Sequence, residues 1–490
     1  MSALRHLRIH PGDVVPGLRH FRNGQYRAGC VYLALFLLSI AVLAGNAGKI
    51  VNGIASLLLT AWLLIVEPEA AKIVFSLEVL EFWIAAVYAV VLPFLIAGIS
   101  AWSASSAAGE RDGEGMSTWE ISYQRFRNDP VARGGTLFLF VLYNIAILAP
   151  LVTPYNPNTF QDGLTTQFRP PFTRLTALVL REPRIHTVPF APERAKGTHG
   201  DLLKSLVRIN TALVEDPTRR LIFVDAFHVE GSNVVATQRT ELLRVPIAQL
   251  VSTDPKEFAT TRLFVLGTDS YGRDILSRMV FGSRISLSIG CIAVFLSITL
   301  GTFIGLTAGY FGRFIDSISM RTVDILLAFP SLFLILITVS LFDTMTVPRI
   351  FLVVLVLGFT SWMGVARLVR GEVLALKGQE FILAAHAAGL SHFRIIFRHI
   401  LPNVMTPVIV NATLRIGGMI LVEAALSFLN LGVQPPTASW GNIIYEGKDY
   451  LAAAWWISTF PGLAIVATVV CFNLIGDGLR DAFDPRLRRM

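Results

Sequence analysis

The sequence predicts an all-α, polytopic membrane protein, and three observations support this fold class. Of its 490 residues, 53% are hydrophobic and 16% are charged, with a mean hydropathy of +0.59; soluble globular chains carry roughly 25% charged residues. Apolar runs of roughly 20 residues, long enough to cross a ~30 Å hydrocarbon core, recur along the chain. Basic residues gather beside these runs, as the positive-inside rule expects of cytoplasmic loops.

Residues 1–119 form an N-terminal extension in which we expect two or three membrane helices. Apolar segments lie at about 29–47, 49–66 and 82–102. The residues before them carry five arginines against one acid, Asp13, which favours a cytoplasmic N-terminus. Two cytoplasmic ends require an even number of crossings, so three alternatives stand. One segment is re-entrant or interfacial, the first two segments form a single interrupted unit, or the N-terminus is outside.

From residue 120 the pattern is more regular and predicts six core spans. Residues 120–153 hold the first, at about 135–152. Residues 285–490 hold the other five, at about 285–310, 324–342, 350–366, 404–428 and 456–475. If residues 104–134 are cytoplasmic, alternation places the loop 367–403 and the C-terminal tail inside the cell. Both segments are basic, so the charge bias supports this orientation.

Residues 154–284 contain no run of spanning length before the second core span and, by this topology, lie outside the cytoplasm. Leu175–Leu180 and Leu221–Val224 have the composition of strands, and the second is expected to continue toward Val229. Leu202–Val214 has helical spacing. We expect a small mixed α/β extracytoplasmic domain in which the strands pack on this helix, since an isolated hairpin is marginal in water.

The most informative segment is Gln379–Asn403, which encodes two short amphipathic helices joined at a glycine. On the first helix, small and apolar residues recur at helical spacing and predict one continuous stripe: Phe381, Ala384, Ala385 and Ala388. Gly389 can end this helix in the left-handed conformation, and Ser391 can cap the next one.

The second helix is expected to end where Pro402 breaks the pattern. Its apolar positions also repeat at helical spacing: Phe393, Ile396, Phe397, Ile400 and Leu401. Small side chains let backbones approach closely, so the pair of helices suits docking into a groove of another protein. An ordinary amphipathic loop is the alternative interpretation.

A turn before the second core span is a second candidate site. Its residues are Gly267, Asp269, Gly272, Arg273 and Asp274. A structural role is favoured over ligand contact, with Thr268 or Asp269 as a helix N-cap and Gly272 permitting a tight bend.

Two ionisable residues within the fifth core span, Arg415 and Glu423, are candidates for the translocation pathway or for helix packing. Charged side chains inside a membrane are costly and usually face protein or a water-filled path. Their spacing places them within about 80° of each other on a helix, so both can line one face. The alternative places Glu423 near the outer headgroups.

Several kinds of chemistry have no sequence signature here. GxxxxGK[ST], HExxH and GxSxG do not occur, so no nucleotide cradle or catalytic constellation is expected, and the protein is predicted not to be an enzyme. No cluster of His, Cys or Asp has metal-ligand spacing, and no cofactor is expected. The net charge of +8 follows from the basic flanks of the spans and gives no indication of nucleic acid binding.

The segment Gln379–Asn403 resembles the EAA loop of ABC importer membrane subunits, through which an ATPase drives the transmembrane helices. The resemblance rests on Ala384-Ala385, Gly389 and Ile400-Leu401-Pro402, while Leu383 stands where the family usually has glutamate. Further motifs are similar to those of dipeptide, oligopeptide and nickel permeases: Arg125–Pro157, Leu266–Arg278, Gly282–Leu287, Asp324–Ser331, Glu423–Pro436, Ser439–Asn442, Asn473–Asp481 and Asp484–Arg486. Over about 120–160 and 262–490 the chain therefore resembles the C-type permeases of these importers.

This resemblance implies a six-helix permease core in the bacterial inner membrane, with the N-terminal helices and the external domain as additions. It implies a subunit that couples an ATPase partner to import, most commonly of di- or oligopeptides, with nickel as the main rival and short oligosaccharides as a further possibility. The implied partners are a homologous B-type permease, two ABC ATPase subunits that bind ATP, an extracytoplasmic substrate-binding protein and membrane lipid. The implied coupling residues are Ala384, Ala385, Gly389, Phe393, Phe397, Ile400, Leu401 and Pro402. The competing class, an ATP-independent transporter with Arg415 and Glu423 as a charge relay, leaves the docking loop unexplained.

Overall fold

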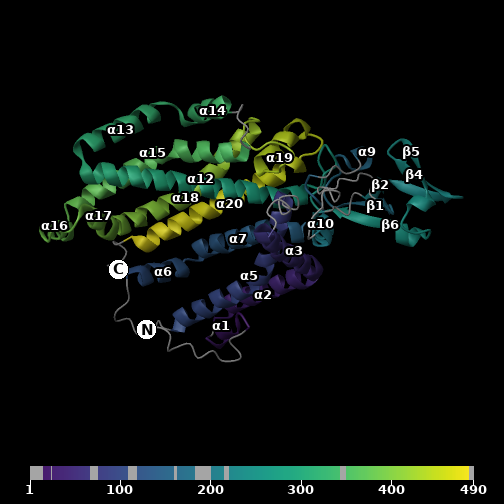
Figure 1. Ribbon diagram of the computed structural model, residues 1–490, viewed down its shortest axis with the longest axis horizontal. Helices are drawn as coiled ribbons and strands as arrows, with labels where there is room; N and C mark the ends of the chain where they lie inside the picture. Colours follow the sequence, from purple (N-terminus) through teal and green to yellow (C-terminus); the bar gives the residue numbers. More distant parts are fainter. Residues whose placement is uncertain are drawn as a thin grey trace.

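The computed structural model describes residues 15–23, 25–66, 76–108, 118–158, 163–182, 200–214, 220–342 and 349–484. Long helices run side by side, and two small sheets extend from one end of the helical body (Figure 1). The short helices α16 (Glu380–Ala387) and α17 (His392–Ile395) lie at the opposite end. The first arginines and Asp13 of the expected basic N-terminus, and the end of the basic tail from residue 485, lie outside the described residues.

Eight of the described helices are long and apolar enough to cross a membrane. They are α2 (Tyr26–Gly45), α3 (Ala47–Val66), α5 (Leu77–Ala108), α7 (Pro130–Ile147), α12 (Ile275–Phe311), α15 (Arg349–Lys377), α18 (Leu401–Phe428) and α20 (Trp456–Phe483), where α18 is continuous with the helical turns before it. The prediction of a multi-pass helical membrane protein is confirmed.

Shorter helices connect these spans. They are α1 (Leu18–Arg22), α6 (Thr118–Asn128), α8 (Ala149–Val152), α9 (Gly163–Thr166), α10 (Gly200–Val214), η5 (Ile247–Gln249), α11 (Pro255–Phe258), α13 (Arg313–Ala328), α14 (Ser331–Phe342), η6 (Ile396–Ile400), α19 (Trp440–Gly447) and η7 (Lys448–Tyr450).

The span expected at 324–342 is not one straight helix. It consists of the end of α13, a break at Phe329 and Pro330, and α14, and the two helices are bent by 89°. Proline disfavours the helical conformation of the residue before it, and Phe329 is extended, with φ −84° and ψ 135°. Together α13 and α14 are a ninth candidate crossing, as a broken span or a re-entrant loop.

The second core span begins earlier than expected, at Ile275 instead of residue 285. Asp274 caps α12, and its first turns carry Arg278 and Arg284, which are paired with Asp269 and Glu81. Paired charges can lie inside a membrane helix, but they lower its hydropathy. A start predicted from the apolar pattern alone therefore lies later in the sequence than the true start of the helix.

Helices α2 and α3 pass α5 in the same direction. The backbone N–H of Gly17, the N-cap residue of the short helix α1 that precedes α2, donates to Ser100 of α5 over 2.9 Å. Ser56 of α3 accepts a hydrogen bond from Trp83, near the start of α5, over 3.1 Å. From α1 to α3 the chain therefore runs antiparallel to α5, from the level of Ser100 to the level of Trp83. Helix α3 continues in the direction of α2 and does not turn back. This supports the alternative in which the first two apolar segments form a single interrupted unit, broken at Asn46.

A glycine stripe lets α12 and α15 pack with their backbones close together. Gly301, Gly305 and Gly309 recur every four residues on α12 and lie against valines of α15. A Cβ at Gly305 would lie 2.6 Å from the carbonyl oxygen of Ala366. That distance is shorter than unbonded atoms tolerate, so the helices can approach this closely only because the stripe has no side chains.

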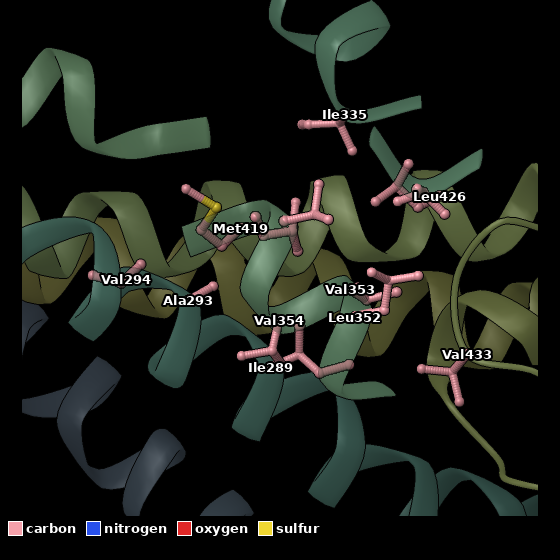
Figure 2. Packing of buried hydrophobic residues seen from close by; sticks show 13 residues of the cluster. Ile289, Ala293, Val294, Ile335, Leu352, Val353, Val354, Met419, Leu426 and Val433 are labelled. Carbon is pink, nitrogen blue, oxygen red and sulfur yellow. The ribbon is translucent and has the colours of Figure 1, made fainter. Parts of the chain in front are cut away.

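An apolar cluster joins α12, α14, α15 and α18 into the centre of the core. Figure 2 shows Ile289 of α12, Ile335 of α14, Val353 of α15 and Met419 of α18 within it. All four side chains are buried. Since each helix contributes to one shared interior, the core spans form one packed unit.

Six strands outside the membrane body form two antiparallel sheets. The first has the order β2 (Leu221–Val224), β1 (Thr173–Val179) and β6 (Ala259–Phe264), and the second has the order β3 (Ala226–Glu230), β4 (Asn233–Gln238) and β5 (Glu241–Pro246). In the first sheet, Ala177 lies opposite Phe223 on one side and Thr260 on the other. Leu178 and Val234 belong to one buried cluster that both sheets share. The expected strand-containing region between the first two core spans is confirmed, and its place outside the cytoplasm stays a prediction.

The strand expected to continue from Leu221–Val224 toward Val229 ends at Val224, and β3 starts the second sheet. Asp225 makes the break, because its backbone N–H donates to the carbonyl of Thr237 over 2.9 Å while its carboxylate binds Arg169. Asp225 thus separates β2 from β3, although the composition predicts a single strand here.

The expected packing of the strands on the helix Leu202–Val214 is wrong. That helix, α10, packs on α3 and α5 of the N-terminal extension, where Val207 shares a buried cluster with Val79 and Trp83. Ser56 of α3 also donates a hydrogen bond to Asn210. The two sheets bury their apolar residues against each other and do not need the helix. Helix α10 instead connects the segment between the first two core spans to the N-terminal extension.

Candidate functional site

The loop expected at 367–403 forms at the end of the helical body opposite the sheets (Figure 1). Gly389 has a φ of 73° and follows α16, as the sequence predicts. The backbone N–H of Leu390 donates to the carbonyl of Ala385 over 3.2 Å, which closes the end of the helix. Ser391 occupies the N-cap position of α17, although its side chain makes no cap hydrogen bond.

The second helix does not end at Pro402. Helix α17 passes into one π-helical turn, η6, and then directly into α18. Pro402 lies in the first turn of α18, where proline is tolerated because the N–H it lacks is not needed by a regular α-helical bond. The end of the loop and the following membrane span are therefore one continuous element, so a displacement of the loop acts directly on α18.

The loop has a buried face, and part of the expected alanine stripe lies on it. Ile382, Ala385, Ile395 and Ile400 belong to a buried cluster with residues of α12 and α15, and Leu401 packs against it. Ala385 is only 6% exposed, so its placement on a face toward another protein is wrong. Ala385 and Ile400 hold the loop to its own chain.

The other face of the loop is exposed. Its residues are Phe381, Ala384, Ala388, Phe393 and Phe397, which we call the docking face. Phe393 is 71% exposed and Phe397 is 51% exposed, and their ring centroids lie 4.3 Å apart. The exposed side of α16 thus offers Phe381 and two small residues, and α17 and η6 offer two adjacent rings. Small residues suit a close approach of backbones, and aromatic rings suit apolar anchoring of a docked helix.

A polar cluster fixes both arms of the loop to α12 and α15. The hydroxyl of Tyr310 lies 2.7 Å from Nδ1 of His392, and the ring of His386 stacks on Tyr310 with a centroid distance of 6.1 Å. Nζ of Lys377 donates to the carbonyl of Tyr310 over 2.6 Å. Because His386 and His392 flank Gly389, one tyrosine positions the helices on both sides of the hinge.

The external turn is a rigid junction, as the structural interpretation predicts. Gly267 and Gly272 have φ values of 78° and 75°. A Cβ at Gly272 would lie 2.1 Å from Oγ1 of Thr166, and one at Gly267 would lie 2.5 Å from the carbonyl oxygen of Arg169. Both positions therefore require glycine for conformation and for space.

The helix cap in this turn is Asp274, and the expected cap at Thr268 or Asp269 is wrong. Asp274 accepts hydrogen bonds from the backbone N–H of Ser277 over 2.8 Å and from its hydroxyl over 2.7 Å. Burial raises the pKa of the Asp274 carboxyl to about 6, and the bonds from Ser277 oppose that rise. Asp269 is not available as a cap because its carboxylate binds two arginines.

These arginines belong to a buried ionic network at the external end of α12. Nε of Arg273 and a terminal nitrogen of Arg278 each lie 2.7 Å from Oδ2 of Asp269. Both arginines also bind Glu446 of α19. The side chains of Asp269 and Arg278 are fully buried and that of Glu446 is 10% exposed, so the network connects the turn to α19 almost entirely within the protein.

Glu423 packs between helices and does not reach the surface of the protein. It is fully buried, and its two carboxylate oxygens accept hydrogen bonds from Ser286 of α12 over 3.0 Å and from Ser427 over 2.9 Å. Of the alternatives for this residue, the structure supports helix packing.

Arg415 is half-buried and points to a different helix. Its Nε donates to Oδ1 of Asn411 over 2.6 Å, and a terminal nitrogen donates to the carbonyl of Ser361 of α15 over 3.2 Å. Since Glu423 faces α12, the two ionisable residues of α18 do not form a charge relay.

Comparisons with known proteins agree with this arrangement. Residues 301–489 match the family described as binding-protein-dependent transport system inner membrane component, and residues 117–171 match the N-terminal transmembrane domain of oligopeptide transport permease C. The chain is 44% identical over 222 residues to the oligopeptide transport system permease protein OppC of Haemophilus influenzae, which is 45% of this chain and 70% of that protein. The chain belongs to the C-type permeases of binding-protein-dependent ABC importers.

Two further relatives match the permease over a similar length, and their names also refer to peptide transport. It is 45% identical over 222 residues to the dipeptide transport system permease protein DppC of Alkalihalophilus pseudofirmus, covering 45% of this chain and 72% of that protein. It is 42% identical over 225 residues to the di/tripeptide transport system permease protein DppC of Pseudomonas aeruginosa, covering 46% and 73%. The permease is a multi-pass protein of the inner membrane.

Several residues of the permease that hold the site together have no local sequence signal. Tyr310 lies 82 positions from His392, and Glu446 lies 168 positions from Arg278, so only the fold brings them together. The glycine stripe of α12 is different, since its repeat of four is visible in the sequence and indicates close helix packing.

Proposed function

We propose that the chain is the subunit through which ATP hydrolysis in partner proteins drives the uptake of di- or oligopeptides. Its relatives carry peptide transport in their names, and the chain shares more than 40% identity with each of the three described above. In this proposal a homologous B-type permease completes the membrane pathway, and an extracytoplasmic binding protein delivers the substrate. Two ABC ATPase subunits bind the ATP, so the chain itself needs no cofactor.

The observation that supports this proposal is the continuity between the docking face and α18. Phe393 lies in α17 and Phe397 lies in η6, and both elements continue into α18 with no break in the helix. The hinge at Gly389 and the anchoring of His386 and His392 to Tyr310 hold the two short helices in one orientation. A rigid element shared by the ATPase contact and a membrane span is what coupling between distant sites requires.

The test of coupling is an Ala384→Glu variant in the complete importer. A buried charge at a tightly packed interface costs several kcal/mol, so we expect the ATPase to co-purify with the variant at less than about one tenth of the wild-type yield. Ala452→Glu, at another exposed alanine, four residues before α20, is the matched control and is expected to retain full association.

Uptake of a labelled dipeptide into cells is measured in the same strains. Loss of uptake with Ala384→Glu and retention with Ala452→Glu supports coupling through the docking face. Wild-type levels of both ATPase association and uptake with Ala384→Glu would contradict it. Uptake of nickel or an oligosaccharide, without uptake of peptides, would contradict the proposed substrate and leave the coupling result intact.

A further inference from the structure

Arg415 differs from three other arginines of the core helices α12 and α15 in the partners that it binds. Arg278, Arg284 and Arg370 each bind a carboxylate of this chain: Asp269, Glu81 and Asp316. Within the described part of the chain, no acidic side chain pairs with Arg415, whose hydrogen bonds go to an amide and to a backbone carbonyl. An ionisable residue inside a membrane marks a functional path by default, since its charge needs a partner.

The surface around Arg415 is built from small and neutral residues. Its second terminal nitrogen lies over Gly364 of α15, where a Cβ would be only 2.5 Å away. On α18, Gly418 lies one helical turn further along the same side, and a Cβ there would meet nothing within 4 Å. Asn411 and Ser361 therefore hold two nitrogens of the guanidinium, and the third nitrogen lies against Gly364, which has no side chain.

The nearest acidic residue on the same helix is not available as a counter-ion. Glu423 is fully buried, and both of its oxygens are occupied by serine hydroxyls on the side of α12. Arg415 follows the start of α18 by 14 residues, a rise of about 21 Å along the helix. It thus lies well inside the span that is continuous with the docking face.

We propose that Arg415 binds the terminal carboxylate of the peptide during its passage through the membrane. This inference rests on the proposed function, because it requires a peptide substrate. A carboxylate entering a region of low dielectric loses hydration, and a held guanidinium replaces it with charge-assisted hydrogen bonds. Because α18 moves with the docking face, the ATPase cycle can bring this cation into the path and withdraw it.

The test compares two substrates that differ only in this group, Ala-Phe with a free carboxylate and Ala-Phe with a C-terminal amide. Initial uptake is measured in vesicles that contain the complete importer, with binding protein saturated by either substrate. The affinity of the binding protein for each substrate is measured separately. The selectivity of the binding protein can then be separated from the selectivity of the membrane subunits. The readout is the ratio of the two uptake rates.

We expect the wild-type importer to transport the free acid about tenfold faster than the amide, which corresponds to about 1.4 kcal/mol. In Arg415→Gln the ratio should fall to about one, and Arg415→Lys should restore part of it because the charge is retained. Gly364→Ala should lower the ratio as well, because the added methyl group displaces the guanidinium while leaving it present. Arg321→Gln, at an exposed arginine of α13, is the charge-matched control and should keep the wild-type ratio.

Three results would overturn the inference. The first is an unchanged ratio in Arg415→Gln. The second is failure of Arg415→Gln to assemble with the other permease while Arg415→Lys assembles normally, since the missing carboxylate would then belong to that subunit. The third is a wild-type ratio of one. If the wild-type importer takes up neither peptide, the proposed function itself has failed, which is a separate outcome.

Discussion

The carboxylate of Asp269 binds several groups in the turn that precedes α12. It accepts hydrogen bonds from the backbone N–H groups of Tyr271 and Arg273 and from the side chains of Arg273 and Arg278. Every one of these donors is near it in the sequence, so the turn organises itself before any distant helix takes part. Glu446 of α19 then supplies the second carboxylate that two guanidinium groups need.

Asp269→Asn should therefore lower the stability of the permease strongly. The change leaves two buried arginines with one carboxylate, and breaking a buried ion pair costs about 3–5 kcal/mol. The measurement is the thermal midpoint of the purified permease in detergent, followed by the reaction of the half-buried Cys291 and Cys471 with a thiol dye after the exposed Cys30 is changed to serine. Asp201→Asn is the control, because its pairing with Lys204 is exposed and should contribute little. Equal midpoints for the two variants would show that the network is not needed for stability.

At the scale of helices, the pair α12 and α15 shows how the core reaches its density. Gly301, Gly305 and Gly309 remove side chains from one stripe, and branched side chains of α15 fill the space. In lipid the hydrophobic effect does not drive helices together, so close van der Waals packing has to do so. The stripe lies between the external ionic network and Tyr310, and it keeps the two ends of α12 in fixed relation to α15.

Gly305→Ala should disrupt the packing of α12 on α15 more than the addition of one methyl group suggests. The new Cβ would lie 2.6 Å from a backbone oxygen of α15, which cannot move aside as a side chain can. We expect overpacking to cost about 1–3 kcal/mol and to lower the thermal midpoint. Gly134→Ala in α7, where a Cβ would meet nothing within 4 Å, should be neutral or slightly stabilising. A destabilisation of equal size in both variants would mean that helix flexibility, not packing, explains the effect.

The sequence predicts elements well where one physical signal dominates. Long apolar runs locate the spans, and Gly389 with its left-handed φ locates the hinge of the coupling loop. The prediction fails where two signals compete. Paired charges hide the start of α12, and Pro402 is read as a break although a π-helical turn accommodates it. Ala385 is assigned to the outer face because periodicity shows that a stripe exists but not which part of it meets the chain's own core.

In the whole permease, the two segments proposed to contact partner proteins are separated by the length of the helical body. The docking face lies at one end and the two sheets lie at the other (Figure 1). Helix α10 connects the external region to the N-terminal extension through Asn210 and Val207. This connection could not be predicted from sequence, because the apolar face of α10 fits a sheet as well as it fits other helices.

This orientation predicts opposite accessibility for two serines that can be changed to cysteine with little change in size. Ser232, in the turn between β3 and β4, should react with an impermeant thiol reagent in intact cells as Ser232→Cys. Ser391→Cys, at the coupling loop, should react only after the cells are permeabilised. Both positions are exposed in the structure, so burial does not explain a difference. The exposed native cysteine is removed first, by Cys30→Ser. Labelling of Ser391→Cys in intact cells would invert the orientation.

The ionic network at the start of α12 also sets an order of events during synthesis. A ribosome makes Asp269, Arg273 and Arg278 together, but Glu446 follows Arg278 by 168 residues. Until α19 emerges, the two guanidinium groups share Asp269, and the external end of α12 stays incomplete while four later helical segments are inserted: α13, α14, α15 and α18. A nascent chain that stops short of α19 therefore presents an unfinished charge pair on the outer surface, which distinguishes a truncated permease from a complete one before any partner has joined it.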